Sequence, residues 1–250
     1  IFLETLVDLI RKSLGEEELM KTAKNLKNDW NSNIFHCASG NSKHEEVFST
    51  LFRLIKDVLS IEEIQSMMKQ QDKWQQNVLH FLILNNDNEK ALQDFISILP
   101  KIFPNDEELK QFLSEREGEY NRNALSLIAS YNKNEKVLQE FWKFAESKMT
   151  PDELNNMLNE VDLQGFNSFH QAAFYNTKIF LETLVDLIRK SLGEEELMKT
   201  AKNLKNDWNS NIFHCASGNS KHEEVFSTLF RLIKDVLSIE EIQSMMKQQD

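Results

Sequence analysis

The stretch Asp162-Leu-Gln-Gly-Phe-Asn-Ser-Phe-His-Gln-Ala-Ala173 decides the fold, because its central signature returns at regular intervals. The signature is an Asn, a mostly apolar pair and usually a His. It occurs at Asn33 and His36, Asn77 and His80, Asn123 and Ser126, Asn167 and His170, and Asn211 and His214. Successive signatures begin 44, 46, 44 and 44 residues apart. This spacing predicts an array of similar units.

A coarser repeat contains the finer one. Residues 1–72 return without a substitution as residues 179–250, a period of 178 residues. We predict a single continuous array over 1–250, with units at 28–71, 72–117, 118–161, 162–205 and 206–250. An array offers the same surface again and again, which favours binding or building over a catalytic cleft that is assembled once.

Each unit is predicted to contain three helices. The first follows the signature and ends in an Asn-rich loop, and the second is longer and amphipathic, as between residues 47 and 59. The third begins with a capping residue three positions before a Glu, at Ser60, Asn105 and Thr150. The fold class expected from this pattern is all-α.

Composition and charge exclude several kinds of partner. The 250 residues carry 29 basic and 40 acidic side chains, a net charge of −11, so the chain is a poor candidate for binding nucleic acid or anionic lipid. We see no apolar run of the roughly 18 residues that a membrane helix needs. Because the sequence holds no Asn-X-Ser/Thr glycosylation site, we expect a cytoplasmic, intracellular location.

Nothing in the sequence supports an enzyme. Each 178-residue period holds one cysteine, Cys37 or its copy Cys215, which excludes a disulfide framework and a zinc site built from several thiolates. His36 and Cys37 are adjacent on a helix and point about 100° apart, so they cannot form a thiol–imidazole pair. We therefore predict no catalytic residue, metal, cofactor or small-molecule substrate.

The stretch 162–173 resembles the ankyrin repeat, whose pattern is Asp-x-x-Gly-x-Thr-Pro-Leu-His-x-Ala-Ala; Asn replaces Thr here. The glycine slot holds Asn31, Gln75, Asn121 and Gly165 in turn. Units near 44 residues exceed the usual 33 by the third helix. The resemblance implies an α-solenoid, in which the signature residues, His36, His80, His170 and His214 among them, tie the turn together through backbone hydrogen bonds.

The same resemblance implies where a partner would bind. In the ankyrin family, the residues beside the turn glycine point toward the concave face and contact partners. The aromatic residues in those slots are Trp30, Trp74, Tyr120, Phe166 and Trp208. Aromatic side chains are common binding anchors. Alternatively, each ring packs on the tip of the next unit and forms a ladder within the solenoid.

Two functions follow from this pattern. The first is a scaffold that binds one or more protein partners through the turn tips. The alternative is an architectural element, a long superhelical rod or filament whose function depends on length. Identical copies provide no distinct terminal units with polar outer faces, so we also expect apolar ends and end-to-end self-association.

Overall fold

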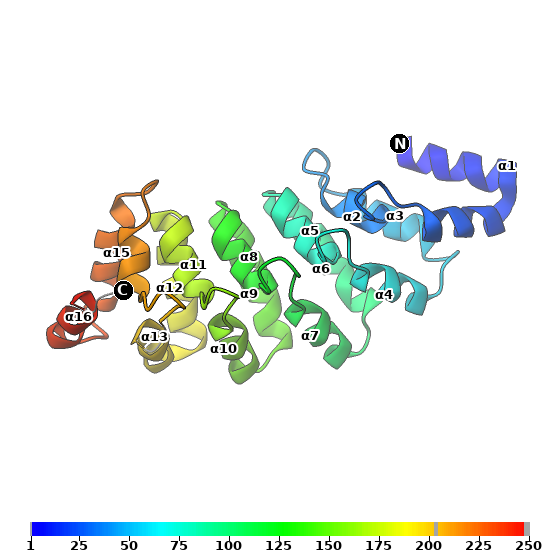
Figure 1. Ribbon diagram of the computed structural model, residues 1–250. Helices are drawn as coiled ribbons and strands as arrows, with labels where there is room; N and C mark the ends of the chain where they lie inside the picture. Colours follow the sequence, from blue (N-terminus) through cyan, green and yellow to red (C-terminus); the bar gives the residue numbers. More distant parts are fainter. Residues whose placement is uncertain (1, 203–204, 248–250) are drawn as a thin grey trace. The chain divides into compact units, whose positions relative to one another are not determined.

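The computed structural model describes residues 2–202 and 205–247, and within these ranges it contains sixteen helices and no β-strand (Figure 1). The predicted all-helical class is confirmed. The helices are α1 (Phe2–Asn25), α2 (Ile34–Ser39), α3 (Val47–Ile55), α4 (Ile61–Lys69), α5 (Val78–Asn85), α6 (Glu89–Ile102), α7 (Asp106–Ser114), α8 (Ala124–Tyr131), α9 (Glu135–Lys148), α10 (Pro151–Asn159), α11 (Ser168–Tyr175), α12 (Lys178–Ser191), α13 (Gly193–Lys202), α14 (Ile212–Ser217), α15 (Glu224–Ile233) and α16 (Ile239–Met246).

The helices after α1 recur in sets of three, from α2–α4 to α14–α16, and they fall into two compact parts, Ile1–Glu119 and Tyr120–Asp250. In the first part, α2 packs against α5 and α3 against α6. In the second, α11 packs against both α8 and α14, and α12 against both α9 and α15. Like helices of successive sets are therefore neighbours within each part (Figure 1).

An asparagine side chain starts the first helix of every set. Asn33 Oδ1 accepts hydrogen bonds from the N–H groups of Phe35 and His36, at 2.9 and 3.2 Å. Asn77, Asn123, Asn167 and Asn211 are the corresponding N-caps of α5, α8, α11 and α14. Asparagine is favoured here because its short side chain satisfies backbone donors that the helix leaves unpaired.

The third helices begin at the three predicted caps, Ser60, Asn105 and Thr150, and the boxes at Ser60 and Thr150 are reciprocal. Asn105 accepts from the N–H groups of α7 on its own. There, the carboxylate of Glu108 accepts a hydrogen bond from Gln65 Nε2 at 3.2 Å. The Glu of this box therefore contacts the neighbouring set.

A second set of asparagines closes the other end of the first helices. Asn176 Nδ2 donates to the carbonyl oxygens of Ala129 and Asn132, at 3.0 and 2.9 Å. Asn86 makes the equivalent pair of bonds to the end of α2, and Asn219 to the end of α11. Within each part of the chain, these asparagines thus supply hydrogen-bond donors to the terminal carbonyls of the set before.

Candidate partner-binding site at the turn tips

The turn before each first helix is held by one acidic or amide side chain. Asp72 Oδ1 accepts hydrogen bonds from the N–H groups of Trp74 and Gln76, at 2.8 and 3.0 Å. Asp162 and Asn206 make the same two bonds in their own turns. This side-chain acceptor organises five residues into a compact tip that projects the middle residues outward.

One residue in every tip has a left-handed backbone. The φ angles are 61° at Asn31, 59° at Gln75, 59° at Asn121, 75° at Gly165 and 61° at Asn209. Glycine and asparagine adopt this region readily, whereas Gln75 does so at a cost of about 1–2 kcal/mol. These are the positions that the sequence pattern aligned with a turn glycine.

Successive tips are joined by main-chain hydrogen bonds. In the first part of the chain, Lys73 N–H donates to the Trp30 carbonyl at 2.8 Å. In the second, Leu163 N–H donates to the Tyr120 carbonyl at 2.9 Å, and Asp207 N–H to that of Gln164 at 3.1 Å. Because the backbone fixes neighbouring tips together, their side chains form a pre-ordered row within each part.

Two exposed tryptophans, Trp30 and Trp74, lie against each other in this row, and we call them the tip pair. Their ring centroids lie 5.8 Å apart and the rings are tilted by 52°. Trp30 is 51% exposed and Trp74 39% exposed. The Lys73 ammonium lies 5.9 Å from the centroid of the Trp74 ring. The pair offers a wide apolar surface beside a positive charge, a common composition for a protein-binding anchor.

The structure corrects the prediction that Phe166 is an exposed tip residue. Its side chain is only 2% exposed and packs edge-on against Trp208, with ring centroids 5.4 Å apart. Phe166 lies one residue before its signature Asn, whereas the other four tip aromatics lie three residues before theirs. The corresponding residue in this tip is Gln164. The two positions flank the residue of positive φ, and the later one turns inward.

The tip aromatics are therefore partly stacked and partly open. Trp30 on Trp74 and Trp208 on Phe166 agree with the ladder alternative, yet the three tryptophans stay at least 39% exposed. Tyr120 is half-buried, with the Arg122 guanidinium 4.5 Å from its ring centroid.

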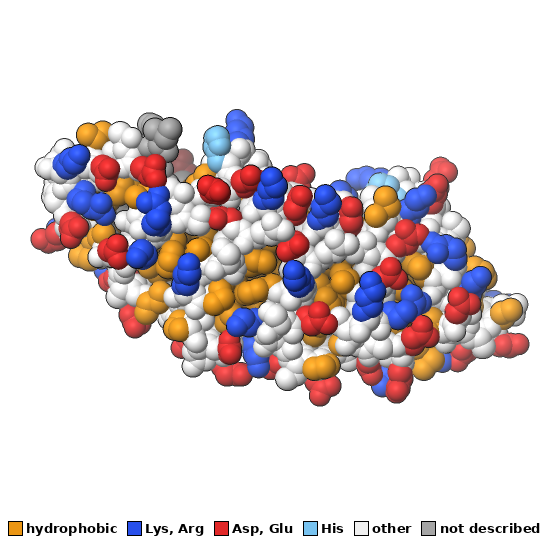
Figure 2. Space-filling view, turned by 180° about the vertical axis from the view of Figure 1, so that it is seen from behind, with side chains coloured by type: hydrophobic (Ala, Val, Ile, Leu, Met, Phe, Trp, Pro, Cys, Tyr) orange, Lys and Arg blue, Asp and Glu red, His pale blue; other side chains and the backbone are white. Residues whose placement is uncertain are grey.

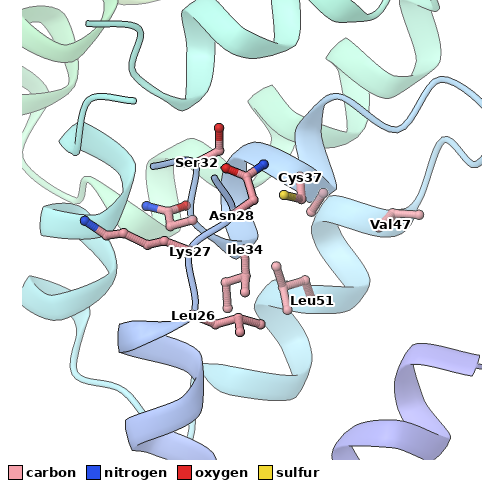
Figure 3. A pocket seen from close by; sticks show the side chains of 10 residues that line it. Leu26, Lys27, Asn28, Ser32, Ile34, Cys37, Val47 and Leu51 are labelled. Atoms are coloured by element: carbon pink, nitrogen blue, oxygen red, sulfur yellow. Dashed lines mark hydrogen bonds between the residues drawn. The ribbon is translucent and has the colours of Figure 1, made fainter. Parts of the chain in front are cut away.

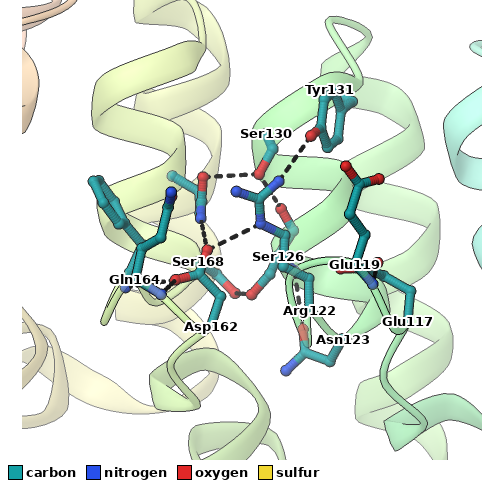
Figure 4. Close-up of polar contacts among 12 residues, drawn as sticks. Glu117, Glu119, Arg122, Asn123, Ser126, Ser130, Tyr131, Asp162, Gln164 and Ser168 are labelled. Atoms are coloured by element: carbon teal, nitrogen blue, oxygen red, sulfur yellow. Dashed lines mark hydrogen bonds and ion pairs between the residues drawn. The ribbon is translucent and has the colours of Figure 1, made fainter. Parts of the chain in front are cut away.

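Arg122 belongs to a buried polar cluster that sequence reasoning missed (Figure 4). Its Nε donates to Asp162 Oδ2 at 3.0 Å and its Nη1 to the Tyr131 hydroxyl at 2.8 Å. Gln171 Nε2 also donates to Asp162 Oδ2, at 2.6 Å, and Ser130 Oγ to Gln171 Oε1 at 2.9 Å. Since its members satisfy one another, we interpret the cluster as a fixed joint between α8 and α11.

The signature histidines bond to the backbone. His80 Nδ1 accepts from the Asn77 N–H at 3.3 Å, and Nε2 donates to the Glu115 carbonyl at 2.9 Å. Burial lowers the pKa of His80 to about 4, so the ring is neutral and Nε2 carries its proton. His36 Nε2 lies 3.1 Å from the Gln76 carbonyl in the same way. Each of these rings therefore links the start of a first helix to the backbone of a later turn or helix end.

The signature asparagines also join the first helix to the third. Nδ2 of Asn33 donates to the Met67 carbonyl, that of Asn123 to Met157, and that of Asn211 to Met245, each at 2.8 Å. One amide thus caps a helix with its oxygen and binds another helix with its nitrogen. This explains why Asn recurs at this position. Ser or Asp would cap the first helix but lack the amide nitrogen that donates to the third helix.

The geometry around Cys37 gives no nucleophile. The neighbouring His36 ring is occupied by Asn33 and the Gln76 carbonyl, and burial raises the pKa of the Cys37 thiol. In the part of the chain that the structure describes, no three His, Cys, Asp or Glu side chains gather as a metal site would require. None of the described helices is long and apolar enough to cross a membrane.

Comparisons with known proteins address the fold. No protein-family model matches the chain, and no curated protein matches it. The structure is similar to a chain from the complex of the predatory endopeptidase Bd0816 of Bdellovibrio bacteriovorus with the immunity protein Bd3460. The TM-score is 0.57 and the similarity covers 92% of each chain at 15% identity. At this identity only the fold is shared, and the class it defines is an all-helical protein.

Proposed function

We propose that this protein is a non-enzymatic scaffold of ankyrin-like units that binds a protein partner through the tip pair. The observation that carries the proposal is two large indole rings held open at adjacent tips. A monomer that leaves such rings in water loses solubility unless another surface covers them. Main-chain hydrogen bonds between the tips hold the two rings in place before binding. Binding a partner therefore costs less conformational entropy.

The net charge of −11 favours a protein over a nucleic acid as the ligand. On the face in Figure 2, acidic and basic side chains are interspersed around apolar ones, and no basic stripe of the kind that follows a phosphate backbone is present there. The structural neighbour comes from a complex between two proteins, an endopeptidase and an immunity protein. We take a protein surface with an apolar patch and nearby acidic groups, suited to Lys73, as the partner.

The test compares capture of proteins from source cells by the native chain, by a Trp30→Ala/Trp74→Ala variant and by a Leu14→Ala control. Leu14 is exposed and lies away from the tips, on α1. The expected result is a protein whose capture falls at least about tenfold in the tip variant, for a loss of about 1.4 kcal/mol or more. Equal capture by all three chains, with unchanged circular dichroism, would overturn the proposal.

The alternative is the architectural rod. It is favoured by the identity of residues 1–72 and 179–250, which supplies the same packing surfaces at a fixed period. Electron microscopy of the native full-length protein separates the two, because a rod shows long particles of uniform width, whereas a scaffold co-purifies with its partner.

A further inference from the structure

One face of the first copy, residues 1–72, is open where the second copy, residues 179–250, is covered. We call it the leading face and define it by Leu6 on α1, Ile34 and Cys37 on α2, and Val47 on α3. Ile34, Cys37 and Val47 line an apolar cavity of about 490 Å³ together with Leu26 and Leu51 (Figure 3). An open apolar cavity of this size needs an occupant.

The second copy shows what the same side chains look like when they are covered. Leu184, Ile212, Cys215 and Val225 are the equivalents, and each is at most 2% exposed, whereas Leu6 is 43% exposed. The covering helices are α11, which packs against α14, and α9, which packs against α12. Among the helices described within residues 2–119, none takes these two places beside α2 and α1.

Polar groups at the edge of the face repeat the contrast. Asn219 Nδ2 donates to the carbonyls of Ala173 and Asn176 at the end of α11, at 3.1 and 2.8 Å. Its equivalent, Asn41 Nδ2, has no acceptor among the described residues, although Asn41 Oδ1 accepts from its own loop. The leading face therefore carries a donor placed for the carbonyl end of a helix such as α11.

We infer that the leading face is a docking surface for another copy of residues 73–178, received through its α9 and α11. The sequence of the face is identical to one that binds these helices in the same molecule, so shape and hydrogen bonding match without further assumption. This inference goes beyond the scaffold proposal, because it concerns a different face and does not involve the tip pair.

Within one chain, α9 and α11 already cover the second copy. These two helices are therefore occupied by the second copy of the face. Another copy of residues 73–178 must bring its own free α9 and α11. The simplest way to supply them is a chain in which another copy of residues 73–178 is joined before Ile1, in the register of the repeat.

The test uses thiol reactivity with a maleimide, because Cys37 is exposed and Cys215 is buried. Chains with Cys215→Ser or Cys37→Ser report each thiol alone. In the native length, Cys37 should react at least about tenfold faster than Cys215, which reacts only after local opening. In the extended chain, made with serine at every other cysteine position, Cys37 should slow to the rate of Cys215.

The control is Val47→Lys in the extended chain, which places a charge in the covered face and should restore the fast reaction of Cys37. Circular dichroism should show that the added residues are as helical per residue as the native chain. The inference is overturned if Cys37 keeps its fast rate in the extended chain, or if the added residues gain no helix. Neither measurement depends on the tip tryptophans, so the two proposals fail separately.

Discussion

Residues 1–72 and 179–250 have the same sequence but different surroundings, and this pair separates what a unit does alone from what its neighbours supply. The first copy is covered on the side of α5 and α6 and open on its leading face. The second is covered by α11 and α9 and open on the opposite side, where Met246 is 43% exposed and its equivalent Met68 is fully buried. After their signatures both copies form the same three helices, α2–α4 and α14–α16, to within one residue at each end. Local sequence therefore determines the helices, and neighbours determine which side chains are buried.

The largest expected effect comes from placing a positive charge at the same position of one copy or the other, in two separate variants. Val225→Lys buries an ammonium in the covered face, so we expect the free energy of unfolding of the part 120–250 to fall by about 3 kcal/mol or more. Val47→Lys should cost less than about 1 kcal/mol, since that side chain lies at an open cavity and can reach water. Urea unfolding of the two variants measures the difference; equal losses would show that the two faces are equally covered.

A similar pair probes the opposite side of the copies. Met68→Ala should cost about 2–4 kcal/mol, because the side chain is fully buried and leaves a cavity. Met246→Ala should cost about 0.5 kcal/mol or less, as expected at an exposed position. Thermal unfolding followed by circular dichroism gives both values. A larger loss for the second variant would contradict the burial pattern.

Acid should weaken the histidine ties between sets. Burial lowers the pKa of His80 to about 4 and also lowers that of His36, while an unfolded histidine titrates near about 6.5. Between these values the unfolded chain binds more protons, so stability should fall as pH drops from about 6.5 toward 4, by up to about 1.4 kcal/mol per pH unit for each such histidine. His80→Gln should flatten the slope in urea unfolding, and an unchanged slope would reject the assignment.

The predictable part of the fold is local. The Asn–His spacing and the capping residues gave the number, order and approximate starts of the helices, because N-caps depend on a few neighbouring residues. Phe166 was misjudged for a related reason. Its distance from the signature differs by two residues from that of Trp30 or Trp208, and the pattern alone gave no sign that this change moves a side chain from the surface to the interior.

The buried cluster around Arg122 and Asp162 was not predictable, because it depends on residues 40 positions apart that face each other only after α8 and α11 pack. The loop asparagines stand out in the sequence as a composition bias. Their role depends on carbonyl groups of the preceding set, whose positions the sequence does not show. A single amino-acid sequence shows the repeat period clearly but says little about which residues of different repeats are in contact.

The smallest expected effect concerns those asparagines. Asn219→Ala removes two hydrogen bonds to the end of α11 and leaves the carbonyls of Ala173 and Asn176 buried without that donor, so it should cost about 1–2 kcal/mol more than Asn41→Ala. Asn41→Ala removes the hydrogen bonds that Asn41 Oδ1 accepts within its own loop, so any additional loss in Asn219→Ala reports the contact with the preceding set. If urea unfolding gives the same loss for both, the donor adds nothing to docking and the apolar cavity alone defines the leading face. A difference of the expected size, removed when another copy of residues 73–178 precedes Ile1, would show that the first copy makes the same contact once its neighbour is present.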